Sequence, residues 1–357
     1  MSAAETRAVP AAEPEVTAAG IARLAGVGRA AVSNWRRRHA DFPQPVGGTA
    51  ASPAFALYEV EEWLRHHGKT ARVPLEERAW QLLLAEPGEP SATLVAVGEL
   101  LLGGAPSAAE DPAAAADDGP APARGLGHPL REAVAALAAE RGTADAFRDL
   151  LRRHFTALTV VTTPAETAAL MAEIAGPVRS VLDPACGVGT LLAAARGPRG
   201  GAPRELRGQE KDPELARLAG LRLAMHGAHA VRIDAGDSLL ADHHSAARVD
   251  AVLCHPPANE RHWGHDDLAY DTRWEYGLPA RGESELAWVQ HALARLRPGG
   301  TAVVLLPPAV ASRRAGRRVR SALLRSGALR AVVALPLAPL VAACGAAVPQ
   351  LSGRGLG

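Results

Sequence analysis

The chain has 357 residues, enough for roughly two or three domains, and 48% of them are hydrophobic, which is ample for buried cores. The formal net charge of +1 excludes a protein that is basic over its whole surface, so contact with nucleic acid requires a local patch. Three cysteines without C-x-x-C spacing support neither disulfides nor a zinc site, and no apolar run spans a bilayer, so a cytoplasmic protein without metal or membrane is expected.

The first predicted module covers residues 16–70. Residues 16–38 predict two helices joined by a tight turn at Gly26, a Pro/Gly-rich wing could follow over 41–57, and an amphipathic helix is predicted over 58–67. Four polar side chains share one face of the second helix and can reach base edges or phosphates: Arg29, Ser33, Asn34 and Arg37. The pattern resembles the winged helix-turn-helix of MerR-like and excisionase-like modules, which implies DNA binding. A small helical bundle for protein contacts is the alternative.

A helical segment over 71–103 and an Ala/Pro/Gly/Asp-rich flexible linker over 104–127 follow this module. We expect the main domain boundary at the linker. Residues 128–357 then predict a helical lead-in and a second domain, whose core covers about 159–336. Within it, the sequence Thr-Pro-Ala-Glu at 163–166 predicts a capping box with proline at the first helical position.

A glycine loop organises the second domain. Residues 181–192 read V-L-D-P-A-C-G-V-G-T-L-L, which predicts a buried strand, a tight turn and the start of a helix. Gly187 and Gly189 let the backbone turn and approach a ligand closely. The spacing fits neither G-x-G-x-x-G nor a P-loop, but it resembles the S-adenosylmethionine loop of amino-methylating DNA methyltransferases, D-P-A-C-G-x-G. The resemblance implies cofactor contacts from five residues of the loop: Asp183, Ala185, Cys186, Gly187 and Gly189.

Two acidic residues follow later strands. Glu210 ends a predicted strand over 205–210 and lies ~20 residues or a little more past the loop, where α/β cofactor folds place the acid that binds ribose hydroxyls. Asp237 follows a strand over 231–233, where the resembling family has a polar side chain near the cofactor's adenine; a surface turn is the alternative. The family's Thr-Pro pair implies that Thr163 abuts the methionine end of the cofactor, although the helix cap explains this residue equally well.

The predicted catalytic motif stands at the end of a strand over 249–254. The family carries Asn-Pro-Pro and an aromatic residue there, and this chain has His255, Pro256, Pro257 and Ala258. In the family, the Asn oxygen and the first proline carbonyl accept the two hydrogens of an adenine amino group, and the aromatic stacks on the flipped base. Neutral His255 accepts only one hydrogen bond, and protonated His255 accepts none. Ala258 offers no stacking face, so roughly 1–3 kcal/mol of base-binding free energy is lost.

The segments after the motif extend the resemblance. Residues 259–282 hold four aromatic side chains, which we expect to pack on the sheet, with replacement of the missing stacking partner as the alternative. Residues 285–300 resemble the methylation subunits of type I restriction–modification systems. An arginine-rich helix is predicted over 310–325. Its arginines are expected to face solvent, and a patch that contacts phosphates is the alternative. Residues 336–357 lack alternation, so a truncated or altered end is expected to leave the strand at 329–335 poorly paired.

The resemblance covers about 149–336. It implies an α/β fold, a Rossmann-like S-adenosylmethionine-dependent methyltransferase sheet, preceded by a small all-α or winged helix-turn-helix domain. It also implies adenine-N6 DNA methylation with S-adenosyl-L-methionine in a restriction–modification or related defence system, with DNA and a separate specificity subunit as partners. The alternative is a DNA-binding regulator whose methyltransferase domain is catalytically degenerate. Methylation of a protein amide is a third reading.

Overall fold

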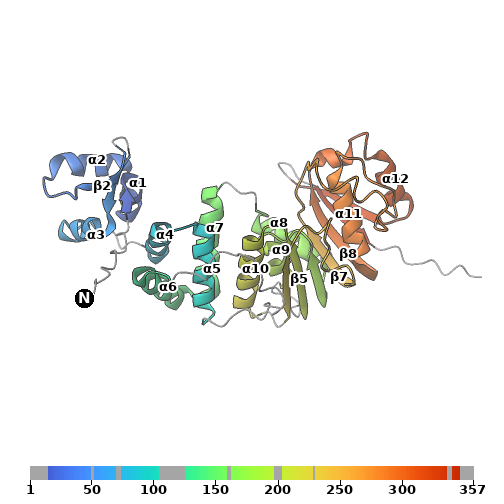
Figure 1. Ribbon diagram of the computed structural model, residues 1–357, viewed down its shortest axis with the longest axis horizontal. Helices are drawn as coiled ribbons and strands as arrows, with labels where there is room; N and C mark the ends of the chain where they lie inside the picture. Colours follow the sequence, from blue (N-terminus) through green and yellow to red (C-terminus); the bar gives the residue numbers. More distant parts are fainter. Residues whose placement is uncertain are drawn as a thin grey trace, which may run out of the picture. The chain divides into compact units, whose positions relative to one another are not determined.

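The computed structural model describes most of the chain (Figure 1). The described residues are 15–49, 52–69, 74–103, 125–158, 162–196, 203–227, 230–335 and 340–345. They form two compact units, over 15–158 and 162–345. Most of the predicted linker lies outside the described residues, as do 346–357. None of the helices in the described part combines the length and apolar character needed to cross a bilayer.

The first unit begins with a small mixed module. Its elements are β1 (Glu15–Thr17), α1 (Ala18–Leu24), α2 (Arg29–Arg38), β2 (Pro45–Gly48), β3 (Pro53–Ala56) and α3 (Leu57–His66). The Thr17 hydroxyl accepts a hydrogen bond from the Gly20 amide and so caps α1. The three strands form an antiparallel sheet with β3 in the middle. Val32, Phe55 and Trp63 are buried, so α2, the hairpin and α3 share one core.

Four helices complete the first unit: α4 (Leu75–Ala85), α5 (Pro90–Leu101), α6 (His128–Arg141) and α7 (Thr143–Leu158). Arg141 on α6 bonds Glu76 on α4 and Asp149 on α7, each at 2.8 Å. The sequence assigned 128–158 to the lead-in of the second domain, whereas the structure groups α6 and α7 with α4 and α5. α6 and α7 pack against α4 and α5, which precede the linker. Hydrophobic periodicity within one segment does not indicate which distant segment it packs against.

The second unit contains a seven-stranded sheet. Its strands are β4 (Ser180–Asp183), β5 (Glu205–Glu210), β6 (Val231–Ala235), β7 (Val249–Cys254), β8 (Leu296–Leu306), β9 (Leu329–Ala334) and β10 (Leu340–Gly345). The spatial order is β6-β5-β4-β7-β8-β10-β9. The first five strands in this order pair in parallel, and β10 is antiparallel to both β8 and β9. The carboxyl ends of the parallel strands therefore meet at one edge.

Helices cover both faces of this sheet. Figure 1 shows α8 (Ala165–Ala175), α9 (Thr190–Ala194) and α10 (Pro213–Met225) on one side, with α11 (Ser284–Ala294) and α12 (Arg317–Arg325) on the other. A short 3₁₀ helix, η1 (Pro308–Ala311), precedes α12. Side chains alternate between the two faces along each strand: Val181 and Leu253 pack with Met171 of α8, while Leu182 and Cys254 join the cluster of α11. This three-layer arrangement is the predicted α/β fold.

The prediction that the strand at 329–335 is poorly paired was wrong, because this strand, β9, pairs with β10. β10 lies between β8 and β9 and pairs along its length with both, with an irregularity between Ala343 and Cys344. Cys344 is 1% exposed. A strand that is paired on both edges and built from small apolar residues need not alternate between polar and apolar positions, so the sequence carried no signal for it.

Candidate active site

The glycine loop joins β4 to α9. Gly187 and Gly189 have φ of +51° and +73°, a left-handed backbone in which other residues are strained. A Cβ on Gly187 would meet no atom within 4 Å, whereas one on Gly189 would contact Ala219 and Leu223 of α10 at 3.4 Å. Gly187 therefore leaves open space beside the backbone, and Gly189 allows close packing of α10.

Two other loop residues are buried beneath this turn. Asp183 is 1% exposed, and its Oδ1 accepts the Ala185 amide at 3.1 Å. Burial raises the pKa of Asp183 well above its ordinary value; the Ala185 hydrogen bond opposes this shift and the charge of Glu210 adds to it. The Cys186 amide donates to the Gln209 carbonyl at 3.0 Å, and burial raises the pKa of its thiol. These two hydrogen bonds thus fix the end of β4 and the glycine loop.

Glu210 is tied directly to the glycine loop. One carboxylate oxygen accepts the Gly187 amide at 2.8 Å, and the other accepts the Asp212 amide at 3.1 Å. A carboxylate has about four lone-pair sites, so two remain for hydroxyl donors. Asp212 caps α10 through the Glu214 amide. The acid predicted to hold a ribose is therefore positioned next to the open face of Gly187.

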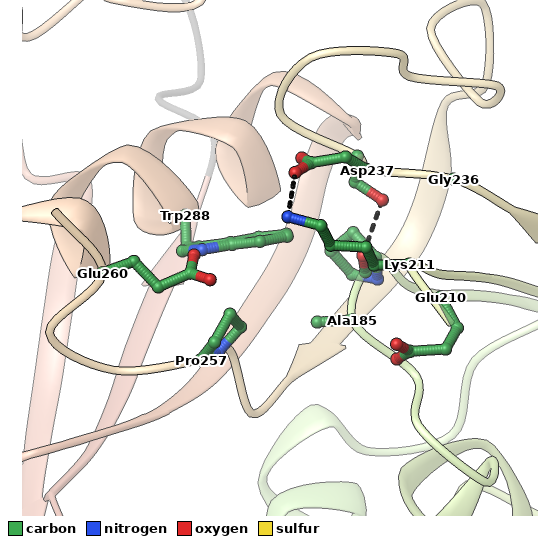
Figure 2. A pocket seen from close by; sticks show the side chains of 10 residues that line it. Ala185, Glu210, Lys211, Gly236, Asp237, Pro257, Glu260 and Trp288 are labelled. Carbon is green, nitrogen blue, oxygen red and sulfur yellow. Dashed lines mark hydrogen bonds and ion pairs between the residues drawn. The ribbon is translucent and has the colours of Figure 1, made fainter. Parts of the chain in front are cut away.

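Figure 2 shows the pocket that these strand ends form. It has a volume of about 320 Å³, part of it open to solvent, and its walls include Ala185, Glu210, Asp237 and Pro257. Asp237 Oδ1 accepts the Leu239 amide at 3.0 Å, and its other oxygen lies 3.1 Å from Lys211 Nζ. The hydrogen bond from Lys211 to Asp237 raises the pKa of that lysine. Asp237 therefore shapes a turn and also faces the pocket.

Three polar side chains and one indole that the sequence did not single out also line this pocket: Lys211, Ser238, Glu260 and Trp288. Lys211 follows the predicted acid directly and is one of two lysines in the chain, so its position was a usable signal. Burial raises the pKa of Glu260, an effect that Lys211 opposes. Trp288 is 5% exposed, and its indole nitrogen has no hydrogen-bond partner among the described residues. The pocket wall therefore offers a charged amine, a carboxyl group and an indole.

The catalytic motif follows β7, which is buried along its whole length. His255 is half-buried, and its Nδ1 lies 2.9 Å from the Thr163 hydroxyl. Burial lowers the pKa of His255. The capping-box prediction was wrong, because α8 begins at Ala165 with Pro164 as its N-cap and without a side-chain cap. The Thr163 hydroxyl contacts His255 instead, so Thr163 lies against the predicted catalytic motif.

The residues after the histidine differ in exposure. Pro256 is buried, whereas Pro257 and Ala258 are exposed. Asn259 has φ of +60°, and its side-chain oxygen accepts a hydrogen bond from Arg313 at 2.5 Å. This hydrogen bond turns the Asn259 side chain toward Arg313.

A buried carboxylate fixes the chain at this point. Glu285 on α11 accepts the Asn259 amide at 3.1 Å and pairs with Arg313 at 3.1 Å. Its side chain is fully buried. The backbone of Asn259 is therefore fixed to α11 by Glu285, whose charge is balanced by Arg313.

The aromatic loop over 259–282 packs on the sheet, as expected, through three of its four aromatic residues: Trp263, Trp274 and the half-buried Tyr276. Trp263 and Trp274 are buried in the core cluster, with their ring centroids 5.9 Å apart in an edge-to-face arrangement. Arg273 donates to the Leu239 carbonyl at 2.6 Å and pairs with Asp271 at 2.7 Å. The loop is thus attached beside the turn of Asp237. Tyr270 is fully exposed.

The residues predicted to contact DNA lie on α2 in the first unit. Arg29, Ser33 and Arg37 are exposed and recur at the i, i+4 spacing of one helix face, and Asn34 is half-buried beside them. The Asn34 side-chain oxygen accepts a hydrogen bond from Arg37.

The comparisons with known proteins bear on the second unit. The model of a family described as N-6 DNA methylase matches residues 157–348, more than half of the chain. The chain belongs to the N-6 DNA methylase family. A relative from Haemophilus influenzae, the type I restriction enzyme HindI methylase subunit, is 29% identical over 188 residues, which are 49% of this chain and 41% of the relative. The MjaVIII methylase subunit of Methanocaldococcus jannaschii is 31% identical over 147 residues, 36% of this chain and 25% of that one. The chain spans less than half the length of these curated relatives.

Solved structures agree on the fold. A type I restriction–modification methyltransferase subunit from Streptococcus thermophilus superposes with a TM-score of 0.54 at 24% identity, covering 61% of this chain and 53% of that one. A protein of Listeria monocytogenes described as a class I S-adenosylmethionine-dependent methyltransferase gives a TM-score of 0.54 at 15% identity, covering 78% and 89%. This N-6 DNA methylase chain therefore has the Rossmann-like sheet of S-adenosylmethionine-dependent methyltransferases.

Proposed function

We propose that this protein is an S-adenosylmethionine-dependent DNA methyltransferase acting on N6 of adenine, and that it works in a restriction–modification or related defence system with a separate specificity subunit. One observation carries the proposal: Gly187, Glu210, Asp237 and the Pro256–Pro257 turn meet at the carboxyl ends of adjacent parallel strands. Family membership and the methylase subunits among the relatives support the reaction class. A DNA substrate inside the cell implies a cytoplasmic location.

The residues present fit the cofactor. Gly187 leaves open space, Glu210 keeps lone pairs for ribose hydroxyls, and Asp237 offers a carboxylate at the pocket wall for an adenine amino group. Asp183, with Ala185, Cys186 and Gly189, shapes the loop around them. When bound, S-adenosylmethionine supplies an electrophilic methyl group on a sulfonium centre.

His255 decides whether methylation is efficient. A neutral imidazole has one N–H and one acceptor nitrogen. If Nδ1–H donates to the Thr163 hydroxyl, Nε2 carries a lone pair that can accept a hydrogen of the target amino group. Thr163 then acts as a positioning residue that selects this tautomer. The carbonyl of Pro256 is the second acceptor, as in the family motif. When both amino hydrogens are held in hydrogen bonds, the amino nitrogen becomes more tetrahedral and more nucleophilic.

DNA contact would come from basic faces in both units. In the first unit, Arg29 and Arg37 of α2 are exposed. In the second, Arg314, Arg317 and Arg318 are exposed at the start of α12. Guanidinium groups of this kind neutralise phosphates and make binding salt-dependent.

A DNA-binding regulator with a degenerate methyltransferase domain is the second candidate. The observation that favours it is the pair of departures at the motif: His255 offers a single acceptor, and Ala258 is exposed without a stacking face. Such a protein would bind DNA, and could still bind the cofactor, without transferring a methyl group.

The deciding experiment measures cofactor binding by calorimetry and then transfer of labelled methyl groups to DNA, with the full chain. We expect saturable binding and label on adenine N6. Binding without transfer at cofactor saturation would favour the regulator, and absence of cofactor binding would contradict both the enzyme and its site. Transfer that rises on adding a specificity subunit of the same system would support that partner.

A further inference from the structure

Two histidines and an aspartate converge in the first module, away from the residues proposed to contact DNA. The ligand-capable atoms of His39, Asp41 and His67 all lie within 4.8 Å of one another. His39 and His67 are half-buried, and Asp41 is exposed. Among the described residues, this is a group of histidine and acidic side chains close enough together to hold a metal ion after a small adjustment. The sequence predicted no metal because its cysteines lack metal-ligand spacing, and this group of histidines and an aspartate departs from that prediction.

The hydrogen bonding of His67 leaves one nitrogen for a cation. Its Nδ1 lies 3.0 Å from the Trp63 carbonyl, which can only accept, so Nδ1 carries the hydrogen. In neutral His67, Nε2 then presents a lone pair to Asp41 Oδ2 at 3.3 Å. Two lone pairs face each other favourably only when a proton or a metal cation lies between them, and the converging third ligand, His39, favours the metal. A backbone carbonyl that holds the far nitrogen of a histidine is the usual outer partner of a metal-bound imidazole.

The distances suit a small divalent ion. Zn²⁺ bonds of about 2.0–2.1 Å in a tetrahedron separate two ligand atoms by roughly 3.3 Å, which matches the His67–Asp41 distance of 3.3 Å. His39 must approach by at most roughly 1.5 Å, and its ring lies edge-on to that of His67, with centroids 5.0 Å apart. Two imidazoles and one carboxylate form a three-ligand set of the kind that binds Zn²⁺ with a water molecule in the fourth position.

The backbone dipoles of two helices add an electrostatic potential that favours a cation at this cluster. His39 is the C-cap of α2, and His67 is the C-cap of α3. Helix C-termini carry partial negative charge and stabilise nearby cations, and here two of them converge. Lys69 is the nearby competing cation, and its ammonium group lies over the Trp35 ring, 5.2 Å from the centroid.

We propose that His39, Asp41 and His67 form a Zn²⁺ site that joins the carboxyl end of α2 to the carboxyl end of α3. The ion would fix the orientation of α2, the helix that carries Arg29 and Arg37. Metal binding is independent of methylation, so the site stands whether or not the second unit is an active enzyme.

The test uses the full chain after removal of metal with a chelator. Zn²⁺ uptake is measured by competition with a chromogenic chelator, and Co²⁺ is added separately as a spectroscopic probe. We expect one high-affinity Zn²⁺ equivalent, the visible bands of four-coordinate Co²⁺, and a higher Tm with Zn²⁺. His67→Gln and Asp41→Asn should each weaken uptake at least roughly tenfold, since even outer partners of a metal site are worth about 10- to 100-fold.

His66→Gln is the matched control. His66 is exposed on the same helix, and its Nδ1 contacts the Glu62 carbonyl just as His67 contacts that of Trp63. It should keep the uptake, the Co²⁺ spectrum and the Tm shift. Equal uptake by the wild-type chain and His67→Gln, or equal losses in His66→Gln and His67→Gln, would overturn the proposal. So would the absence of any four-coordinate Co²⁺ spectrum, since the pair would then be an ordinary ion pair.

Discussion

The imidazole of His255 combines two properties that bear on its chemistry. It is hydrogen-bonded to the Thr163 hydroxyl, and burial lowers its pKa. Only the neutral ring has an acceptor nitrogen. A lowered pKa keeps the ring neutral at acidic pH values where a free histidine would be charged, so in the proposed role His255 should keep an acceptor nitrogen over a wider pH range than an exposed histidine would.

Methyl transfer should therefore depend on pH in a defined direction. We expect a constant rate above the lowered pKa of His255 and a decline as pH falls through it, in a window below the ordinary value of 6.5. In His255→Asn the acidic decline should disappear, and the plateau should rise by roughly 2- to 10-fold, the worth of about one hydrogen bond. The check is the pH profile of labelled transfer to DNA. An acidic limb that persists in His255→Asn would assign the titration to another group.

Thr163→Val separates two roles of this threonine. If Thr163 selects the His255 tautomer, the variant should lower transfer by roughly 2- to 10-fold and leave the calorimetric affinity for the cofactor unchanged. If its hydroxyl contacts the cofactor, affinity should fall as well. Thr162→Val, at the exposed preceding residue, is the control.

Glu210 gives a second test at the same scale. Replacing Glu210 by Gln removes a charged acceptor beside Gly187, and charged hydrogen bonds contribute about 1.5–3 kcal/mol, so cofactor affinity should fall roughly 10- to 100-fold. Calorimetry with the full chain measures the change. Glu214→Gln makes the same chemical substitution at an exposed position on α10 and should bind normally. Equal affinity of the two variants would exclude Glu210 from the cofactor site.

At the scale of elements, the sequence predicted pocket-lining residues best where a residue's position depends on its own strand. Glu210, the last residue of β5, and Asp237, just after β6, both line the pocket because the carboxyl ends of these strands meet at one edge. Trp288 and Glu260 were missed because they reach the pocket from α11 and from the loop before it, and no local spacing encodes that contact. The partner of Thr163 was missed for the same reason.

β10 offers a test of how the sheet edge is held. Ala342 pairs with Val304 of β8 and Val332 of β9. A proline there removes a ladder donor and should cost several kcal/mol, about as much as the ~3 kcal/mol of a proline inside a helix. Hydrogen exchange should accelerate in β9 and stay slow in β4. Ala342→Val keeps the amide and serves as the control. Unchanged protection of β9 in Ala342→Pro would show that β9 is held without β10.

At the scale of the whole molecule, the sequence indicated two units but divided them at the linker. The second unit was recognisable because its strands and glycine loop follow in a regular order along the chain. The assignment of α6 and α7 depended on which apolar faces meet after folding, as at the bridge from Arg141 to Glu76 and Asp149. Contacts between segments separated by a long linker leave no periodic trace in the sequence.

The cysteines report on the second unit as a whole. Cys186, Cys254 and Cys344 are buried, and burial raises the pKa of each thiol, to about 12 for Cys344. Since the thiolate is the reactive form, iodoacetamide at neutral pH should label none of them in the native protein and all of them after unfolding. Mass spectrometry checks this. Ala258→Cys, at an exposed position, should be labelled in the native state. Rapid native labelling of Cys344 would mean that β10 opens locally.

The place of β10 in the sheet also affects how the protein folds while it is being synthesised. β8 is complete at Leu306, but the strand that covers its outer edge ends at Gly345. The ribosome must therefore add about 40 residues, which takes roughly 2–8 s at about 5–20 residues per second, while that edge stays open. An open edge is a template for pairing with another chain. A later arrival of β10 would lengthen this interval and favour aggregation of the nascent protein.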